Sequence, residues 1–383
     1  MSKLQELIKE LCPDGVEFRK LGEVCELSRG KVYSKTYINN NIGNYPVYSS
    51  QTANNGELGK ISSYDYDGEY LTWTTDGAYA GTIFHRQGRF SITNVCGLIT
   101  IKSNKLLVRF LYYWLSIKAK EYVYQGMGNP KLMTNQMEII EIPLPPLEIQ
   151  NEIVRILDTF TSHTAELQAE LQARKEQYEY YRNKLLTFDE NDEGVKWMKL
   201  GEIGNTCMCK RIMKHQTSDI GEVPFFKIGT FGKEADAFIS YELYDEYKNK
   251  YSFPRKGEIL ISASGTIGRT VIYDGQDAYF QDSNIIWIQN DESKVLNKYL
   301  YYYYQIIEWN VEGGTIKRLY NTNLSKTIIA YPPLSEQKRI ISILDKFESL
   351  VNDLSEGLPA EIAAVQEQYE YYRNKLLTFK RKS

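Results

Sequence analysis

The sequence predicts an α+β protein in which two mixed α/β domains are joined by two long, antiparallel coiled-coil helices. Three observations support this fold class. The thirteen residues EQYEYYRNKLLTF occur at 176–188 and again at 367–379, each copy ends a long segment with helical spacing of apolar residues, and each segment follows a block of short strand-like runs. Because a period of about 190 residues is too long for a solenoid, the chain is a duplicated unit with a pseudo-two-fold, circular organisation.

The duplication continues outside the thirteen residues. GVEFRKLGEV at 15–24 matches GVKWMKLGEI at 194–203, and the double prolines at 145–146 and 332–333 are each followed by Leu and, three positions later, by Gln. The repeated order divides the chain into a first domain with a short N-terminal helix at 1–145, a central helical segment at 146–193, a second domain at 194–331 and a C-terminal helical segment at 332–383.

The N-terminal helix is predicted from an apolar stripe. Leu4, Leu7, Ile8 and Leu11 recur at steps of three and four just before the first shared segment. In the second half, the end of the first long helix holds the same position. We therefore expect the N- and C-termini to lie close together.

Short runs of β-branched and aromatic residues, separated by glycine and polar residues, predict strands within each block. The expected strands are 70–74, 82–85, 95–101, 258–261, 270–273 and 285–288, and the expected helices of the blocks are 106–124 and 294–310.

The double prolines predict the starts of the long helices, because proline fixes φ and suits the first helical turn. Apolar residues then follow at steps of three and four over some forty residues, which predicts a helix that buries one face. Mutual antiparallel packing is favoured because the two faces are alike; the alternative is that each helix packs on its own block. Gly357 and Pro359 predict a break in the second helix.

Composition limits the function classes. No apolar run is long enough to cross a bilayer, so we expect neither a membrane span nor a signal peptide. Five cysteines without framework spacing favour reduced thiols in a cytoplasm. Cys207 and Cys209 lack the second pair of ligands typical of zinc sites, and the chain has only three histidines, so no metal site is expected.

Charge is unevenly distributed. Residues 1–145 carry 16 basic and 14 acidic side chains and residues 196–331 carry 17 and 16, whereas residues 146–195 carry 5 and 11. A non-specific nucleic-acid binder is strongly basic, so DNA binding would depend on local patches and on basic partners. Phosphate-loop and dinucleotide-binding motifs are absent, which predicts that the chain is not an enzyme by itself.

The shared segments resemble one known family. Two dissimilar blocks, two helices that open on Pro-Pro-Leu…Gln, and the phrase EQYEYYRNKLL are similar to the specificity (S) subunit of Type I restriction–modification systems over essentially the whole chain. The resemblance implies two target-recognition domains, each reading one half of an asymmetric, bipartite DNA target. One polypeptide with two unlike readers suits such a target, whereas a homodimer suits a palindrome.

The resemblance also implies partners. The helices would dock two methyltransferase (M) subunits, and restriction/translocase (R) subunits would join that core. No cofactor is expected on this chain; S-adenosylmethionine, ATP and Mg would be used by the partner subunits. The near-repeat TAEL–QAEL at 164–171 suggests that the first helix sets the spacer between half-sites, because four helical residues add about 6 Å.

Loops that combine glycine, cations, amides and aromatics are the candidate DNA contacts, since Arg and Lys bind phosphates or guanine and amides read adenine. We expect contacts from Arg29, Lys31, Tyr33, Lys35, Gln51, Thr74, Thr75, Asp76, Tyr79, Asn129 and Lys131, and from Lys210, Arg211, Lys214, Ser262, Ser264, Thr266, Thr315, Lys317 and Arg318. The alternatives for these loops are a solvated charged loop and a tight turn inside the core.

The repeated tyrosines are large aromatics of the kind that anchor interfaces. For the helix seam or M-subunit docking we expect Tyr178, Tyr181, Arg182, Leu185, Tyr369, Tyr372, Arg373 and Leu376. The tyrosines at 301–304 are instead expected on a packed helix face.

Two functions from other classes are alternatives to DNA recognition. A fused nuclease or methyltransferase acting alone would carry catalytic motifs, and activity of the purified chain with DNA, Mg²⁺ and S-adenosylmethionine would reveal it. A purely structural coiled-coil adaptor would leave no footprint on DNA.

Overall fold

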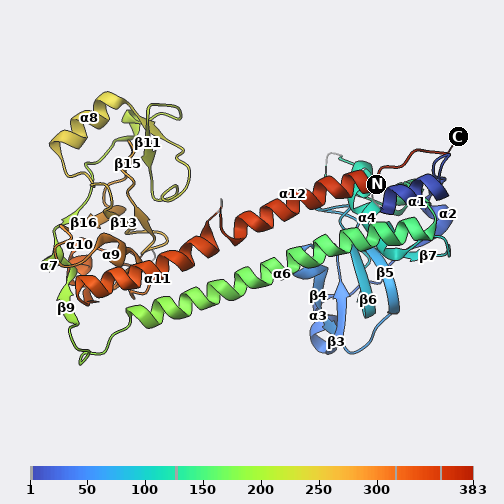
Figure 1. The fold of residues 1–383 in the computed structure, drawn as a ribbon, viewed down its shortest axis with the longest axis horizontal. Coiled ribbons are helices and arrows are strands. Elements are labelled where there is room, and N and C mark those ends of the chain that lie inside the picture. The colour runs from blue at the N-terminus through green and yellow to red at the C-terminus, as the bar shows by residue number, and fades with distance from the viewer. Residues whose placement is uncertain (1–2, 126–127, 315–316, 354–355, 383) are drawn as a thin grey trace. The chain divides into compact units, whose positions relative to one another are not determined.

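The computed structural model describes residues 3–125, 128–314, 317–353 and 356–382, and the chain forms two compact units (Figure 1). Unit 1 comprises Met1–Leu167 and Ile362–Ser383, and unit 2 comprises Gln168–Glu361. Each unit therefore combines one globular block with adjoining parts of the long helices. The division into four segments stays a prediction. No helix among the described residues has the length and apolar run that a bilayer span requires.

The elements of unit 1 alternate short helices with strands. They are α1 (Lys3–Leu11), β1 (Phe18–Lys20), α2 (Leu21–Val24), β2 (Cys25–Arg29), α3 (Lys35–Asn40), β3 (Ile42–Tyr48), η1 (Ala53–Gly56), β4 (Glu57–Ile61), β5 (Tyr66–Thr74), β6 (Ile83–Ile92), β7 (Cys96–Ile101), α4 (Val108–Lys118), η2 (Ala119–Tyr122), α5 (Thr134–Glu138) and β8 (Glu141–Pro143), with parts of α6 (Leu147–Leu186) and α12 (Leu358–Leu376).

Unit 1 is built on a six-stranded sheet of order β2-β7-β5-β6-β3-β4, and β1 pairs separately with β8. The β3–β6 pair is parallel and the other pairs of the large sheet are antiparallel. Helix α4 lies between this sheet and α6, because it packs on β5 and β6 and its Tyr113 bonds to Asp158 of α6. Its Phe110, Leu111 and Leu115 are fully buried and join Leu71 and Trp73 of β5 in one core.

Unit 2 repeats this order with shorter strands. Its elements are β9 (Lys196–Lys199), α7 (Leu200–Ile203), β10 (Thr206–Cys207), η3 (Lys214–Gln216), β11 (Val223–Phe226), β12 (Phe238–Ile239), α8 (Tyr241–Lys250), β13 (Ile259–Ser262), β14 (Thr270–Ile272), β15 (Tyr279–Phe280), β16 (Ile285–Ile288), α9 (Asn297–Tyr303), α10 (Asn321–Lys326), β17 (Ile328–Tyr331) and α11 (Leu334–Asn352), with part of α6.

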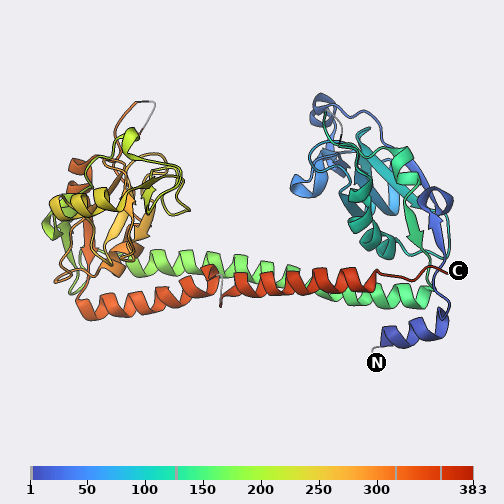
Figure 2. The same ribbon diagram turned by 90° about the horizontal axis from the view of Figure 1, so that it is seen from above.

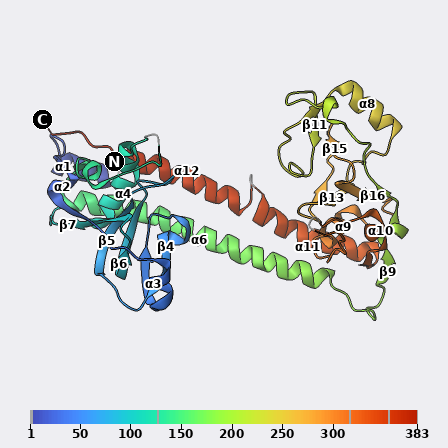
Figure 3. The same cartoon turned by 180° about the vertical axis from the view of Figure 1, so that it is seen from behind.

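In unit 2 the large sheet is divided in two, with orders β10-β16-β13-β14 and β12-β11-β15. The strand pairing explains this division. In unit 1, β6 pairs antiparallel with β5 along most of its length and parallel with β3 at its end. In unit 2, β14 makes the first pairing, with β13, and β15 makes the second, with β11. Two short strands thus replace the single β6. Helix α9 lies between the sheet and α11 (Figure 3).

A buried glutamine joins each long helix to its block. Gln150 Nε2 donates to the carbonyls of Lys105 and Pro145, both at 2.7 Å, and its Oε1 accepts from Leu107 N at 2.9 Å. Gln337 makes the same three bonds in unit 2, to residues 294, 296 and 332, at 2.8–2.9 Å. The repeated Gln after Pro-Pro-Leu is therefore the polar joint between helix and domain.

A second duplicated joint lies about two helix turns farther along. The Tyr113 hydroxyl donates to Asp158 at 2.5 Å, next to Arg109, and in unit 2 Tyr302 donates to Asp345 at 2.5 Å. Burial and the hydrogen bond to the carboxylate raise the pKa of both tyrosines. The two phenols therefore stay protonated donors at neutral pH.

In each unit the long helices pack on each other through stacked aromatic rings. Phe160 of α6 stacks on Tyr372 of α12, with ring centroids 5.6 Å apart and 24° between the planes. Tyr181 of α6 stacks on Phe347 of α11 with the same separation and 23°. The predicted mutual packing of the helices is confirmed within each unit. The alternative also holds in part, because Ile149 of α6 is buried in the unit 1 block.

Both ends of the chain belong to unit 1 (Figure 2). After α12 the chain runs beside Val16, whose N–H donates to Lys380 O at 2.8 Å and whose carbonyl accepts from Lys382 N at 2.9 Å. Leu4 of α1 and Leu377 belong to the same core. The predicted circular organisation is therefore confirmed.

The predicted elements match closely, with one shortened helix. All six predicted strands overlap observed ones, and the second long helix is interrupted between α11 and α12 as Gly357 predicts. The helix expected at 294–310 is wrong in extent, because α9 ends at Tyr303. Turn bonds follow, from Gln305 N to Tyr302 O and from Ile306 N to Tyr303 O, and they bring Trp309 back onto the Tyr304 ring at 5.5 Å.

Candidate nucleic-acid interface

In unit 1, the turn after β5 lies directly against the loop that precedes α5. Asp76 forms an isolated antiparallel bridge with Lys131, and Gly77 N donates to Pro130 O at 3.0 Å. Leu132 N also donates to Thr75 O at 2.8 Å. Two loops that were predicted separately from the sequence are therefore one surface.

Unit 2 brings the corresponding loops together in the same way. Ser264 bridges Arg318, and Leu319 N donates to Ala263 O at 2.9 Å. The Arg318 guanidinium donates through Nη2 to Ser283 O at 2.7 Å and to Asn284 Oδ1 at 2.9 Å. The backbone frame is thus shared, whereas Asp76 and Lys131 are replaced by Ser264 and Arg318.

Arg29 reaches the unit 1 surface from β2. Its Nη1 donates to Asn94 O at 3.4 Å and its Nη2 contacts Met133 Sδ at 3.2 Å. Arg29 therefore lies next to the end of the loop that carries Lys131, because Met133 follows that loop directly.

Lys31 and Tyr33 share one carboxylate. Lys31 Nζ lies 2.5 Å from Asp65 Oδ1, and the Tyr33 hydroxyl donates to Asp65 Oδ2 at 2.6 Å. Burial opposes ionisation of Asp65, but the hydrogen bonds from Lys31 and Tyr33 outweigh it and lower the pKa of this carboxyl. The charge of Lys31 is therefore compensated in this structure.

Three predicted hydroxyls are used inside the turns. Thr74, Thr75 and Ser262 are buried. Thr74 Oγ1 donates to Tyr79 O at 2.5 Å, Thr75 Oγ1 to Val95 O at 2.8 Å, and Ser262 Oγ to Thr266 O at 2.5 Å. These groups shape the loops, because their hydrogen bonds are internal.

Several other predicted residues are exposed. Tyr79 is 64% exposed, and exposed side chains also belong to Lys35, Asn129, Lys131, Lys210, Arg211, Lys214, Thr266 and Lys317. The Gln51 amide is half-buried and donates to Glu57 O within its own loop. Thr315 lies outside the described residues.

A groove of about 570 Å³ is lined by three of the unit 2 candidates, Arg211, Lys214 and Arg318. Four cations line it, namely Arg211, Lys214, Lys227 and Arg318, together with the amides Gln281 and Asn284 and the carboxylates Asp219 and Asp282. Asp282 pairs with Arg211 at 2.8 Å, and Lys227 pairs with Asp236 at 2.8 Å. Among the described residues, no ion pair is found for Lys214 or Arg318. This groove therefore combines cations and amides, the groups that contact phosphates and base edges.

Sequence reasoning missed Lys227, Gln281 and Asn284. Lys227 directly follows β11, and Gln281 follows β15 and donates its backbone N–H to Phe226 O at 2.9 Å. The polar residues just after these two strands were a usable signal. It was overlooked because the strands are only two to four residues long.

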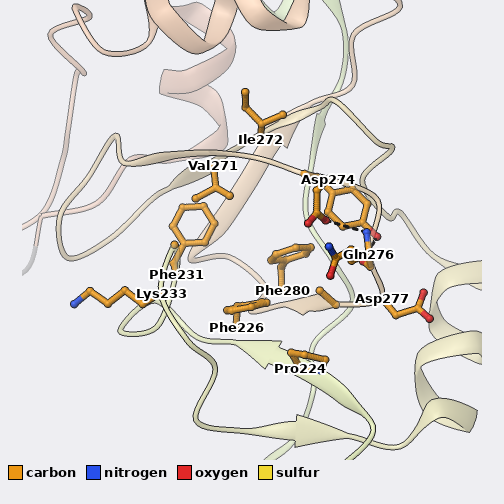
Figure 4. Close-up of a pocket in the computed structure, with 13 residues that line it drawn as sticks. Pro224, Phe226, Phe231, Lys233, Val271, Ile272, Asp274, Gln276, Asp277 and Phe280 are labelled. Atoms are coloured by element: carbon orange, nitrogen blue, oxygen red, sulfur yellow. Dashed lines mark hydrogen bonds between the residues drawn. The ribbon is translucent and has the colours of Figure 1, made fainter. Parts of the chain in front are cut away.

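A separate cavity of about 240 Å³ lies at the other side of β11 and β15 (Figure 4). The rings of Phe226 and Phe280, 5.8 Å apart, and that of Phe231 surround it with Val271. Asp274 and Gln276 stand at its edge. It is mainly apolar and was not predicted.

The predicted helix residues divide into buried and exposed sets. Tyr178 is buried against unit 2, and Arg182 donates to Gln305 at 3.0 Å. Arg373 lies over the Tyr369 ring, and Leu185 and Leu376 are partly buried. Tyr181 and Tyr372 stack in the seam and remain partly exposed.

The neighbouring tyrosines are more exposed and form a duplicated pair. Tyr180 meets Tyr181, and Tyr371 meets Tyr372, each with centroids 5.3 Å apart and 77° between planes. Tyr180 is 58% and Tyr371 60% exposed. Each helix therefore presents the same aromatic edge to solvent.

Comparison with protein families finds the Type I restriction modification DNA specificity domain twice in this chain, at residues 13–177 and 192–364. The chain is 48% identical over 379 residues to a Haemophilus influenzae protein named as a type I restriction enzyme specificity subunit, covering 95% of this chain and 96% of that one. It is 32% identical over 362 residues to a Mycoplasma pneumoniae type I specificity subunit, covering 93% and 96%.

Solved structures share the fold. The S subunit of a type I restriction–modification system from M. genitalium matches with a TM-score of 0.58 at 14% identity, covering 95% of this chain and 96% of that one. A chain from a structure on the assembly and conformational transition of a type I system matches with a TM-score of 0.60 at 18% identity, covering 95% and 98%.

Proposed function

The chain belongs to the family of Type I restriction–modification specificity subunits, and from this premise we propose that each unit reads one half of an asymmetric, bipartite DNA target. As a specificity subunit it is a DNA-binding, non-catalytic component of the restriction–modification complex. We propose that the chain acts in the cytoplasm with its five cysteines reduced. None of the five forms a disulfide in this structure.

One observation carries the proposal. Both units bring the same two loops together by the same backbone bonds, with Leu132 N to Thr75 O in one and Leu319 N to Ala263 O in the other. The side chains on this shared frame differ, since Lys131 and Arg318 present different donors. A common frame with different side chains suits two readers of different half-sites.

Methylation sequencing tests this proposal. Cells that express the chain with its M subunit should methylate one bipartite sequence whose two halves differ. A palindromic target, or no methylated motif that depends on this chain, would count against it.

The unit 2 groove makes the proposal specific. Replacing Lys214 by Gln removes a cation without an ion-pair partner, so the affinity of the S–M complex for its target should fall several-fold. The slope of log K against log salt should fall by about one if Lys214 binds a phosphate. Fluorescence anisotropy at several salt concentrations measures both quantities.

Lys256→Gln is the matched control. Lys256 is also exposed in unit 2, but it precedes β13, at the opposite end of that strand from Ser262 and Ser264. Its replacement should change neither the affinity nor the slope. Equal losses from both variants would show a general charge effect and remove the groove from the proposal.

The proposed partners are two M subunits, bound at the exposed tyrosine pairs of α6 and α12, and R subunits that join the complex. This chain would bind no cofactor, and S-adenosylmethionine, ATP and Mg would act on the partner subunits. The duplicated aromatic edge supports two equivalent docking sites, because exposed aromatics are common anchors of protein interfaces.

A further inference from the structure

Unit 1 contains a buried cation for which the described residues provide no ion pair. Arg86, in β6, is 2% exposed, and its Nη1 and Nη2 have no hydrogen-bond acceptor in the described part of the chain. Its Nε donates to Thr72 Oγ1 at 3.2 Å. No carboxylate among the described residues forms an ion pair with it.

The guanidinium lies between aromatic rings. Its carbon is 3.5 Å from the centroid of the Tyr48 ring and 4.4 Å from that of Phe84. Burial lowers the pKa of Arg86, and Tyr48 opposes this only in part. Because the ordinary pKa of arginine is above 12, the group stays charged at neutral pH. A buried charge without partners is costly, and such groups concentrate at functional sites.

A short, strained cap covers this charge. Asn54 and Asn55 have φ of 48° and 52°, and Gly56 follows with φ of 79°. A Cβ added at Gly56 would lie 3.0 Å from Arg86 Nη2 and 3.1 Å from Gln51 O. Both asparagines are exposed, whereas Gly56 is buried against the guanidinium, so this short segment separates Arg86 from solvent.

The stem of the cap joins the candidate interface. Ser50 Oγ accepts from Thr75 N at 3.3 Å, in the turn that carries Asp76. Thr93 Oγ1 donates to Ser49 Oγ at 3.2 Å, and Thr93 also bridges the backbone of Lys31. DNA on this surface would therefore touch the cap.

Unit 2 shows that the domain does not need this cation in order to fold. The strand pairs give the residue in unit 2 that corresponds to Arg86. Trp73 pairs with Ile83 in unit 1, and Ile261 pairs with Thr270 in unit 2. Arg86 lies three residues after Ile83 and Tyr273 lies three residues after Thr270, so the two positions correspond. Tyr273 donates to Gln276 O at 2.7 Å and lines the aromatic cavity. The position that holds the buried charge in unit 1 therefore borders a mainly apolar cavity in unit 2 (Figure 4).

We propose that Arg86 is a phosphate-binding site for the DNA of the first half-site, covered by residues 51–56 in the free protein and uncovered when DNA binds. The inference rests on the proposed function of unit 1. Two phosphodiester oxygens would accept from Nη1 and Nη2, the bidentate geometry that guanidinium groups favour. This contact adds affinity without reading a base.

Arg86→Met tests the proposal in the S–M complex, on a duplex that carries the target found by methylation sequencing. We expect about a tenfold loss of affinity, a salt slope lower by about one and an unchanged target sequence. The Tm should not fall, because the variant removes an unpaired buried charge. Arg89→Met is the control: Arg89 lies on the same strand but is exposed and paired with Asp67 at 2.9 Å, so it should bind as the wild type does.

A second variant acts in the opposite direction. Gly56→Ala places a Cβ against Nη2 at a left-handed φ and so weakens the closed cap. We expect a several-fold gain in affinity, which is lost when Arg86→Met is added. If Arg86→Met does not fold, the Gly56→Ala variant alone still tests the proposal. DNA affinity of Gly56→Ala that is unchanged or weaker than that of the wild type would overturn it.

The outcomes separate the inference from the proposed function. Wild-type affinity and slope in Arg86→Met, or a lower Tm with unchanged binding, make Arg86 a structural residue. If the wild-type complex binds no specific target at all, the proposed function itself fails.

Discussion

One buried amide side chain forms hydrogen bonds between each of the helices α6 and α11 and its domain. Gln150 and Gln337 are fully buried, and each completes the bonding of three backbone groups near a double proline. Proline cannot donate, and the carbonyls around it need other partners when they are buried. The repeated Gln in the sequence is therefore explained by the backbone that surrounds it.

Gln150→Leu should reduce the free energy of unfolding by about 2–4 kcal/mol, because it leaves two carbonyls and one N–H without partners in the core. Urea denaturation of the S–M complex, followed by tryptophan fluorescence, measures this change. Gln172→Leu, at an exposed position of the same helix, should change stability by less than about 0.5 kcal/mol. Equal stability of the two variants would contradict this explanation.

Residue type alone did not show which of the predicted side chains are exposed and which form hydrogen bonds inside the turns. Lys131 and Lys214 are exposed, whereas Thr74 and Ser262 form internal hydrogen bonds. A hydroxyl in a Gly-rich turn suits either role, and only the path of the backbone decides which way it points. Arg86 was missed because a lone arginine in a strand has no sequence signal.

At the scale of elements, the repeated EQYEYYRNKLL helix has two distinct aromatic uses. Tyr181 and Tyr372 stack on a phenylalanine of the other helix, whereas Tyr180 and Tyr371 point to solvent. Adjacent residues on a helix are about 100° apart, so neighbouring tyrosines serve different faces. The seam and the proposed docking edge are thereby built from the same short motif.

Tyr371→Ala should remove one proposed M-subunit site and leave the other intact. Mass photometry of the assembled complex should show one bound M subunit where the wild type has two, and Tyr180→Ala with Tyr371→Ala should show none. Gln168→Ala, on an exposed part of α6, should keep both. Two M subunits on the double variant would exclude this edge as the docking site.

At the scale of the whole molecule, α6 is one continuous helix of 40 residues, about 60 Å at ~1.5 Å per residue. We propose that its length sets the spacer between the half-sites. Inserting one more four-residue unit after residue 167 should lengthen the spacer by about two base pairs, because four residues add about 6 Å. Methylation sequencing should then find both half-sites unchanged.

The spacer prediction has a simple control. Replacing residues 164–167 by another four helix-forming residues with Leu at the last position keeps the helix length, so it should keep the spacer. An insertion variant that still methylates the original spacing would refute a measuring role for α6.

The sequence by itself determined the duplication, the starts of the long helices, six strands of the two blocks and the circular organisation, because these depend on local propensity and on repeated segments. Only the tertiary structure decided which loops share a surface, which hydroxyls are internal and where Arg86 lies. Asp76 and Lys131 are 55 positions apart yet form one bridge. Such a contact depends on strand order and on the burial of each side chain, which are set by the whole packed domain and have no local signature.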